Sequence, residues 1–125
     1  MSRITVAGAG AFGTALAASL ARDGRDVTLW ARDARAASEM RKTRENARHL
    51  AGILLPENLS ISADTDALAT AETILLTVPT QKLRGFLNDH HSSLAGKTCV
   101  LCCKGIETGT GLLPAQILRE ILPDS

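Results

Sequence analysis

A short β-branched segment near the start of the chain runs directly into three closely spaced glycines. The segment is Arg3–Ala7, and Gly8, Gly10 and Gly13 follow it in the pattern Gly-x-Gly-x-x-Gly. Between a parallel strand and a helix, the first glycine permits a sharp turn and the second lets the backbone approach a diphosphate. The third lets the helix lie close against the strand. The pattern predicts a dinucleotide pocket at a helix N-terminus, where free N–H groups favour an anion.

The residues around the glycines supply the context that this pattern requires. Apolar positions within 12–21 have helical spacing, Gly24 is suited to end that helix, and residues 26–30 form a second strand pattern. Together they make a complete βαβ unit of about 30 residues. The alternative interpretation of the glycines is a flavodoxin-like turn, or a βαβ turn that binds no phosphate.

The rest of the chain continues to alternate between helix and strand patterns. We expect helices over 34–45, 64–71, 82–91 and 112–122, and strands over 59–61, 72–78 and 98–102. This alternation predicts the α/β class: a Rossmann-like, doubly wound, mainly parallel sheet with helices on both faces. The length of 125 residues allows one domain, which we assign to residues 1–125.

Composition excludes several classes of partner. Lys and Arg total 14 against 13 Asp and Glu, giving a formal net charge of +1, and aromatic residues are few. We therefore expect no nucleic-acid partner. The sequence has neither a leader pattern nor an apolar run of about 18 residues, which predicts a cytoplasmic protein without a membrane partner.

Three cysteines lie together in an apolar segment. Cys99, Cys102 and Cys103 are odd in number, which suits buried reduced thiols better than disulfides. Cys99 and Cys102 do form a C-x-x-C pair, so a zinc or redox site is the alternative. Because further ligands are not visible nearby, we expect no metal site.

Arg32 follows the second strand, where this architecture places the adenosine ribose. NAD-selective sites usually carry an acid there, whereas an arginine suits a 2′-phosphate. Arg32 therefore predicts preference for NADP(H), with NAD(H) possible. We expect Asp33 to cap the next helix, and the alternative for Arg32 is a solvated side chain beside Asp33.

Three further positions are candidates for contact with a cofactor. His49 lies in a loop that could approach the adenine, although a loop histidine is commonly just exposed. Pro79 belongs to the turn 78–81 after a buried strand, and we expect this turn to form a wall of the nicotinamide pocket, the alternative being an ordinary proline-directed turn. Lys104 follows the last strand, where a cation could meet a phosphate. By contrast, His90 and His91 lack the spacing of helical metal ligands and are expected on the surface.

Five blocks spread along the chain carry a resemblance to a known family. They are residues 8–17, 29–33, 43–46, 78–81 and 103–107. In order and spacing these blocks resemble the N-terminal part of the bacterial NAD(P)-dependent glycerol-3-phosphate dehydrogenases. The Lys-Gly-Ile-Glu sequence at 104–107 is the most distinctive of them.

The resemblance implies a reaction and roles for individual residues. It implies reversible hydride transfer between dihydroxyacetone phosphate and sn-glycerol 3-phosphate, which feeds phospholipid synthesis. Ala11 and Phe12 would meet the diphosphate region, and Lys104 would touch both cofactor and substrate. Ala11 replaces a serine frequent in the family, which removes one hydroxyl contact. The expected cofactor-binding residues are therefore Gly8, Gly10, Ala11, Phe12, Gly13, Arg32, His49, Pro79 and Lys104.

The resemblance also implies that this chain is the N-terminal, cofactor-binding part of a longer enzyme. Family members continue into a helical C-terminal domain that carries the proposed general base, so we assign no catalytic residue here and expect no turnover by the 125 residues alone. An unpaired sheet edge would then favour a homodimer or larger association. Alternatives are another two-domain NADP-linked dehydrogenase, of the ketopantoate reductase or 6-phosphogluconate type, and a non-catalytic NAD(P)-sensing module.

Overall fold

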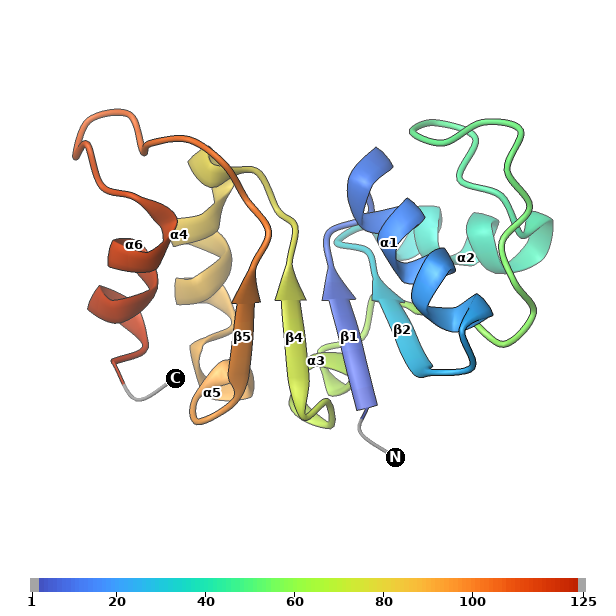
Figure 1. Ribbon diagram of the computed structural model, residues 1–125, viewed down its shortest axis with the longest axis horizontal. Helices are drawn as coiled ribbons and strands as arrows, with labels where there is room; N and C mark the ends of the chain where they lie inside the picture. Colours follow the sequence, from blue (N-terminus) through green and yellow to red (C-terminus); the bar gives the residue numbers. More distant parts are fainter. Residues whose placement is uncertain (1–2, 124–125) are drawn as a thin grey trace.

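Five parallel strands form one sheet in the order β3-β2-β1-β4-β5 (Figure 1). The computed structural model describes residues 3–123. The strands are β1 (Arg3–Ala7), β2 (Asp26–Trp30), β3 (Ser60–Ser62), β4 (Thr73–Leu76) and β5 (Thr98–Leu101). The helices are α1 (Ala11–Arg22), α2 (Ala34–Thr43), α3 (Asp66–Ala69), α4 (Thr80–Asp89), α5 (His91–Leu94) and α6 (Pro114–Ile121). The expected Rossmann-like α/β fold is confirmed, and the strand pairs are all parallel in the described part of the chain.

Strand β1 lies at the centre of the sheet and fixes the register of its neighbours. Ala7 at its carboxyl end is paired with Trp30 of β2 and Leu76 of β4. The strand order reverses at this point, since the chain proceeds from β1 to β2 on one side and from β4 to β5 on the other. In open parallel sheets the crevice at such a reversal is where ligands bind.

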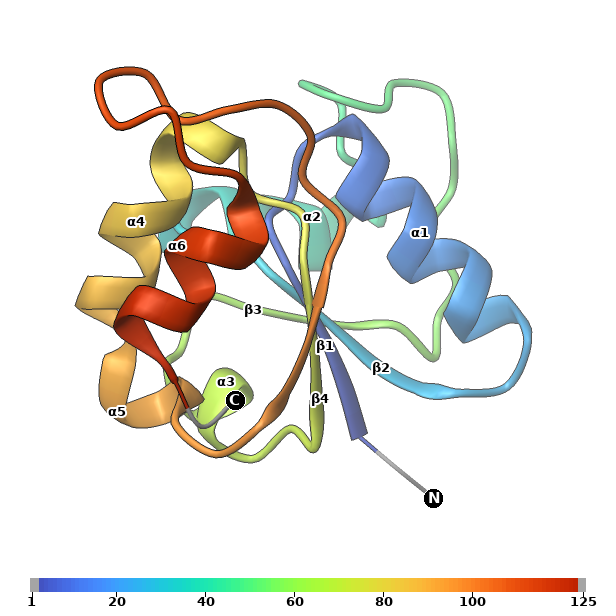
Figure 2. The same cartoon turned by 60° about the vertical axis from the view of Figure 1, so that its left-hand side comes forward.

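Successive residues of β1 point to opposite faces of the sheet, and each face has its own core. Val6 belongs to one cluster with Ala17 of α1 and Leu29 of β2, whereas Ala7 belongs to a second cluster with Leu83 of α4 and Ile117 of α6. Figure 2 shows α1 on one side of the sheet and α4 and α6 on the other. Each large side chain buried in these cores contributes roughly 1.5–3 kcal/mol to folding.

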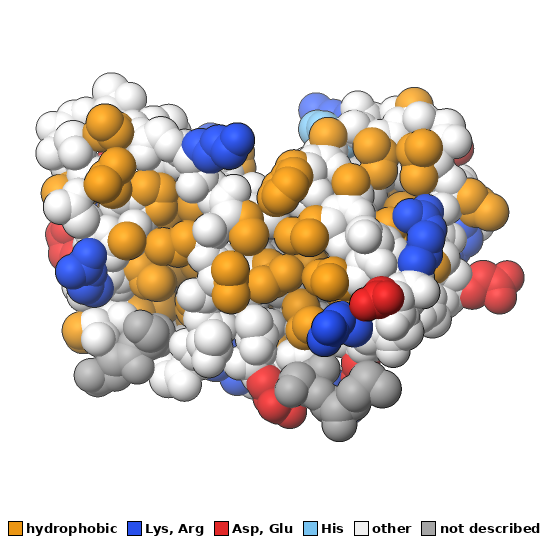
Figure 3. Space-filling view, viewed as in Figure 1, with side chains coloured by type: hydrophobic (Ala, Val, Ile, Leu, Met, Phe, Trp, Pro, Cys, Tyr) orange, Lys and Arg blue, Asp and Glu red, His pale blue; other side chains and the backbone are white. Residues whose placement is uncertain are grey.

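The sheet face that carries α1 is incompletely covered. Leu75 of β4 points to this face and is half-buried, and Val100, its neighbour on β5, is 42% exposed. Figure 3 shows hydrophobic side chains gathered in the middle of the view, between α1 and α6. This apolar surface follows from the doubly wound topology, because the helices after β4 all pack on the opposite face.

Helix α2 begins as predicted but ends earlier. The Asp33 side chain accepts a hydrogen bond of 2.9 Å from the backbone N–H of Arg35, which confirms the predicted N-cap. Arg44, by contrast, adopts the left-handed conformation with φ of 57° and ends the helix before the predicted residue 45. Its guanidinium donates to the carbonyls of Pro56 and Leu59. The helix therefore ends where a distant loop binds the side chain.

Helix α4 begins directly after Pro79, two residues before the predicted start. Three of its side chains form hydrogen bonds with the loop that follows β5. Thr80 donates a hydrogen bond to the Lys104 carbonyl, and Gln81 donates to the Ile106 carbonyl at 2.8 Å. Arg84 donates to both carboxylate oxygens of Glu107, with a shortest distance of 2.9 Å. The hydrogen bond from Arg84 lowers the pKa of Glu107 below its ordinary value.

The ion pair of Glu107 predicts an acid-dependent loss of stability. Because its pKa is depressed in the folded state, the stabilisation is present above the unfolded pKa and is lost as the pH falls through the folded pKa. We expect the wild-type chain to lose more free energy of unfolding between about pH 7 and about pH 3 than Glu107→Gln, as measured by urea denaturation. Glu57→Gln, at an exposed glutamate, is the matched control. An equal pH dependence for wild type and Glu107→Gln would contradict the prediction.

Candidate functional site

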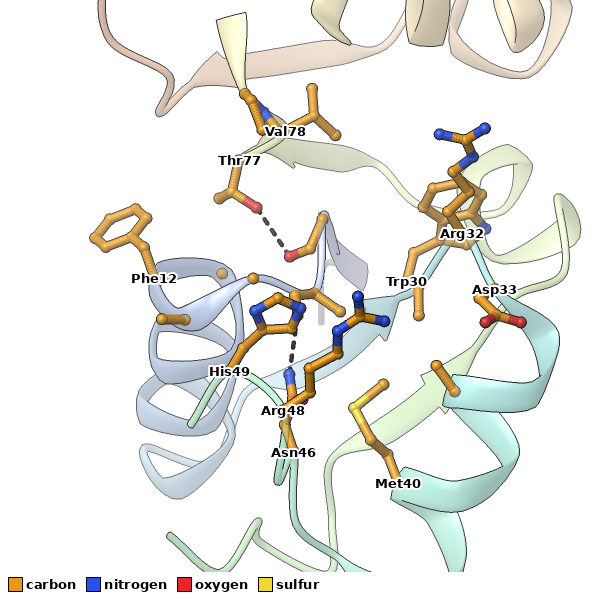
Figure 4. A pocket seen from close by; sticks show the side chains of 18 of the residues that line it. Phe12, Trp30, Arg32, Asp33, Met40, Asn46, Arg48, His49, Thr77 and Val78 are labelled. Carbon is orange, nitrogen blue, oxygen red and sulfur yellow. Dashed lines mark hydrogen bonds between the residues drawn. The ribbon is translucent and has the colours of Figure 1, made fainter. Parts of the chain in front are cut away.

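A large cavity opens at the carboxyl edge of the sheet, above the ends of β1, β2 and β4. Its volume is about 1010 Å³, at the upper end of the range of about 300–1,000 Å³ usual for small-molecule sites. The walls come from the glycine-rich loop, the start of α2, the loop after α2 and one side of α4. Figure 4 shows this cavity from close by, with side chains from these segments directed into it.

The glycine-rich loop has no room for side chains where it meets the sheet. A Cβ on Gly13 would lie 2.0 Å from the Gly8 carbonyl oxygen, and one on Gly8 would lie 2.6 Å from the Thr77 hydroxyl. That hydroxyl also donates to the carbonyls of Ala7 and Gly8, at 2.9 and 3.0 Å. The start of α1 is thereby fixed against β1 and β4.

Gly10 differs from the other two glycines because it faces open space. A Cβ on Gly10 would meet nothing within 4 Å, and its φ of −75° is accessible to any residue. Among residues 3–123 no side chain caps the N-terminus of α1, so the N–H groups of its first turn remain available to a ligand. An anion placed over Gly10 would meet both these donors and the positive end of the helix.

Asn46 ties the loop after α2 to the glycine-rich loop. Its buried side-chain amide donates to the Ala9 carbonyl at 2.9 Å and to the Thr14 hydroxyl at 2.8 Å. Its own carbonyl accepts from the N–H of Leu50 at 2.7 Å, which closes a tight turn. Sequence reasoning assigned Asn46 no role, because its partners lie more than 30 positions away in the chain.

Eight of the nine predicted cofactor-binding residues line the cavity. They are Gly8, Gly10, Ala11, Phe12, Gly13, Arg32, His49 and Pro79. In Figure 4, Phe12 and His49 lie near the start of α1, and Arg32 lies across the cavity at the end of β2. Phe12 is 60% exposed, which makes it the most exposed large apolar side chain among the cavity residues.

Lys104 is the predicted residue that does not line the cavity. It is exposed on the loop after β5, and this loop is held against α4. Gln81 connects the two regions, because it lines the cavity and also accepts a hydrogen bond of 2.8 Å from the N–H of Thr108. Lys104 is therefore carried on a fixed loop next to the cavity.

An aromatic cluster forms the wall below Arg32. The rings of Trp30 and Phe86 meet edge to face at 5.5 Å, and the ring of His90 lies 5.1 and 4.8 Å from them. The expectation that His90 lies on the surface is therefore wrong: it is half-buried and lines the cavity, whereas His91 is exposed as predicted. Desolvation by burial lowers the pKa of His90, while the charge of Asp89 acts in the opposite direction.

The three cysteines lie in β5 and directly after it. Cys99, Cys102 and Cys103 are free and half-buried, and burial raises the pKa of each thiol. Residues 3–123 contain no group of three or more His, Cys, Asp or Glu side chains that could hold a metal ion. Over the same range, no helix has the length and apolar character needed to cross a bilayer.

Comparison with known proteins agrees with this geometry. The sequence model of one family, described as the N-terminus of NAD-dependent glycerol-3-phosphate dehydrogenase, matches residues 3–125. The chain is 53% identical over 122 residues to the glycerol-3-phosphate dehydrogenase (NAD(P)+) of Ruegeria sp.. It is 50% identical over 122 residues to that of Roseobacter denitrificans. Each alignment covers 98% of this chain and 38% of the relative, so the chain spans well under half the length of these proteins.

A solved structure is also similar to this chain over only part of its own length. The crystal structure of glycerol-3-phosphate dehydrogenase from Coxiella burnetii superposes with a TM-score of 0.88 at 30% sequence identity. The superposition covers 97% of this chain and 38% of that one. The similarity therefore extends over almost all of this chain and is confined to part of the larger protein.

Substitutions at Gly13, which is packed against protein, and at Gly10, which faces the cavity, should have different effects. Gly13→Ala should lower the free energy of unfolding by about 1–3 kcal/mol, because the new Cβ meets a backbone oxygen that cannot move aside. Gly10→Ala should change stability by no more than about 0.5 kcal/mol while weakening dinucleotide binding, since its Cβ projects into the space for the ligand. Urea denaturation and calorimetric titration measure the two effects. A Gly10→Ala variant that binds like wild type would contradict the assignment.

Proposed function

The chain belongs to the family of NAD(P)-dependent glycerol-3-phosphate dehydrogenases, and we propose that it is the cofactor-binding part of an enzyme that interconverts dihydroxyacetone phosphate and sn-glycerol 3-phosphate. In this proposal residues 1–125 form the NAD(P)-binding domain. The remainder of a family-length protein supplies the general base and most of the contacts to the substrate. The 125 residues alone are then expected to bind cofactor without turnover.

The observation that carries the proposal is the open phosphate cradle at Gly10. The space above Gly10 is free, the first turn of α1 presents unpaired N–H groups, and the neighbouring glycines are packed against protein. Such a cradle suits the diphosphate of a dinucleotide. When bound, the nicotinamide ring of that cofactor accepts or donates the hydride.

The other predicted residues have roles along the bound cofactor. Ala11 and Phe12 hold the diphosphate through the backbone of α1, and His49 contacts the adenosine half from the loop after α2. Pro79, with Val78, forms an apolar wall that keeps water away from the nicotinamide. Lys104 provides a positive charge for the cofactor and for the phosphate or carbonyl of the substrate.

Arg32 makes NADP(H) the preferred cofactor in this proposal. It lies on the cavity wall two residues after the end of β2, where a dinucleotide fold places the adenosine ribose. A guanidinium there can bind a 2′-phosphate in bidentate fashion. The nearby carboxylate of Asp33 already caps α2 and is less available to a ribose hydroxyl.

Calorimetric titration of the chain with NADPH and with NADH tests this function. We expect binding of both, with NADPH preferred. Arg32→Ala should weaken NADPH binding by about 1.5–3 kcal/mol, roughly 10- to 150-fold, and NADH binding far less. Arg25→Ala, at an exposed arginine near the opposite end of β2, is the control. Absence of binding by the wild-type chain would contradict the function, and equal losses for both cofactors would contradict the role of Arg32.

The proposal also includes self-association of the chain. Strand β5 pairs with β4 on one side, and the apolar surface at Leu75 and Val100 remains exposed beside it. Open strand edges and uncovered apolar faces favour pairing between copies. We expect light scattering to report dimers or larger species as concentration rises, and Val100→Lys to reduce them. A monomer at every concentration would contradict this expectation.

A further inference from the structure

Arg48 lies at the tip of the tight turn that Asn46 closes. The turn is fixed to the glycine-rich loop, because the Asn46 amide donates to the Ala9 carbonyl at 2.9 Å. Within the turn, the N–H groups of His49 and Leu50 donate to the Asn46 carbonyl, at 3.3 and 2.7 Å. The backbone on both sides of Arg48 is thereby held in place beside the phosphate cradle.

The side chain of Arg48 is directed into the cavity. Figure 4 shows its guanidinium between His49 on one side and Trp30 with Arg32 on the other. Arg48 is an exposed cavity residue, as is Arg32, and they come from different segments of the chain. Both arginines therefore border the same cavity, one directly after β2 and the other in the loop after α2.

Both arginines are free to bind an anion. In the part of the chain that the structure describes, neither Arg32 nor Arg48 has a hydrogen bond or a salt bridge. Four carboxylates also line the cavity, and two of them are engaged elsewhere: Asp33 caps α2, and Glu45 accepts from the N–H of Gly52 at 3.0 Å. Glu39 and Asp89, the other two, make no salt bridge with either arginine.

We propose that Arg48 is a second specificity-determining residue of the cavity, and that it binds the 2′-phosphate of NADP(H) together with Arg32. The diphosphate already has its donors in the first turn of α1, next to Phe12 and His49. Arg48 extends from there toward the end of β2, where the adenosine ribose of a bound dinucleotide would lie. Two guanidinium groups on opposite sides of one phosphate provide several charge-assisted hydrogen bonds.

This inference rests on the proposed cofactor binding and deepens it. It differs from the role of Arg32 because Arg48 is not part of the strand-end motif that sets the choice between NAD and NADP in this architecture. An exposed arginine in a loop reads in sequence as an ordinary solvated residue. The anchored turn and the direction of the side chain are what distinguish it.

The test is calorimetric titration of the wild-type chain, Arg48→Ala and Arg48→Lys with NADPH and NADH. Arg48→Ala should weaken NADPH binding by about 10-fold or more and NADH binding by less than about 3-fold. Arg48→Lys should fall between wild type and Arg48→Ala for NADPH, because it retains the charge and loses the bidentate geometry. Arg119→Ala, at an exposed arginine of α6 outside the cavity, controls for the change in net charge.

Two half-cofactor probes locate the phosphate that Arg48 binds. In the proposal, Arg48→Ala weakens binding of 2′,5′-ADP, which carries the 2′-phosphate, and leaves binding of 5′-ADP, which carries only the diphosphate, nearly unchanged. In the double variant with Arg32→Ala, the combined loss should be smaller than the product of the two single losses, since both side chains hold one group.

Each remaining outcome has a definite consequence. Equal weakening of both half-cofactors, or no change in NADPH binding, would overturn the role of Arg48 while leaving the proposed function intact. A wild-type chain that binds neither NADPH nor NADH would overturn the proposed function and this inference with it. Thermal denaturation of each variant separates a lost contact from a lost fold.

Discussion

The close contact between the start of α1 and the sheet is the constraint on which the site depends. A single added carbon at Gly13 would lie 2.0 Å from the Gly8 carbonyl oxygen, which is far inside van der Waals contact. Because no side chain separates them, the first turn of α1 begins directly at the carboxyl end of β1. The unpaired N–H groups of that turn are therefore delivered to the crevice at which the strand order reverses.

The glycine-rich loop is held from two sides by polar side chains of distant segments. The Thr77 hydroxyl, after β4, donates to the loop carbonyls of Ala7 and Gly8, and the Asn46 amide, after α2, donates to that of Ala9. The bonds to Gly8 and Ala9 satisfy backbone acceptors of the loop itself, whereas the Ala7 carbonyl at the end of β1 also accepts from the Thr77 N–H at 3.0 Å. The loop is preorganised as a result, so a ligand does not have to order it on binding.

The sequence predicted well those features that depend on local chemistry. The glycine spacing, the β-branched strands and the Asp33 cap each act over a few residues. The structure has the parallel sheet and the helix cap that they indicate. The sequence could not predict features that depend on partners far away in the chain. The end of α2 at Arg44 is set by carbonyls of the loop before β3, and His90 at the end of α4 is covered in part by Trp30 of the distant strand β2. Arg48 was missed for the same reason, because only the anchored turn directs it into the cavity.

Helix α4 joins the cavity at the carboxyl edge of the sheet to the loop that carries Lys104. Its first turn contributes Gln81 to the cavity wall, and the same side chain binds the loop at Ile106 and Thr108. One turn later, Arg84 fixes that loop through Glu107. Any displacement of α4 would therefore be transmitted to the loop through short, direct contacts. Lys104 itself does not line the cavity, but the loop that carries it is held by a helix that does.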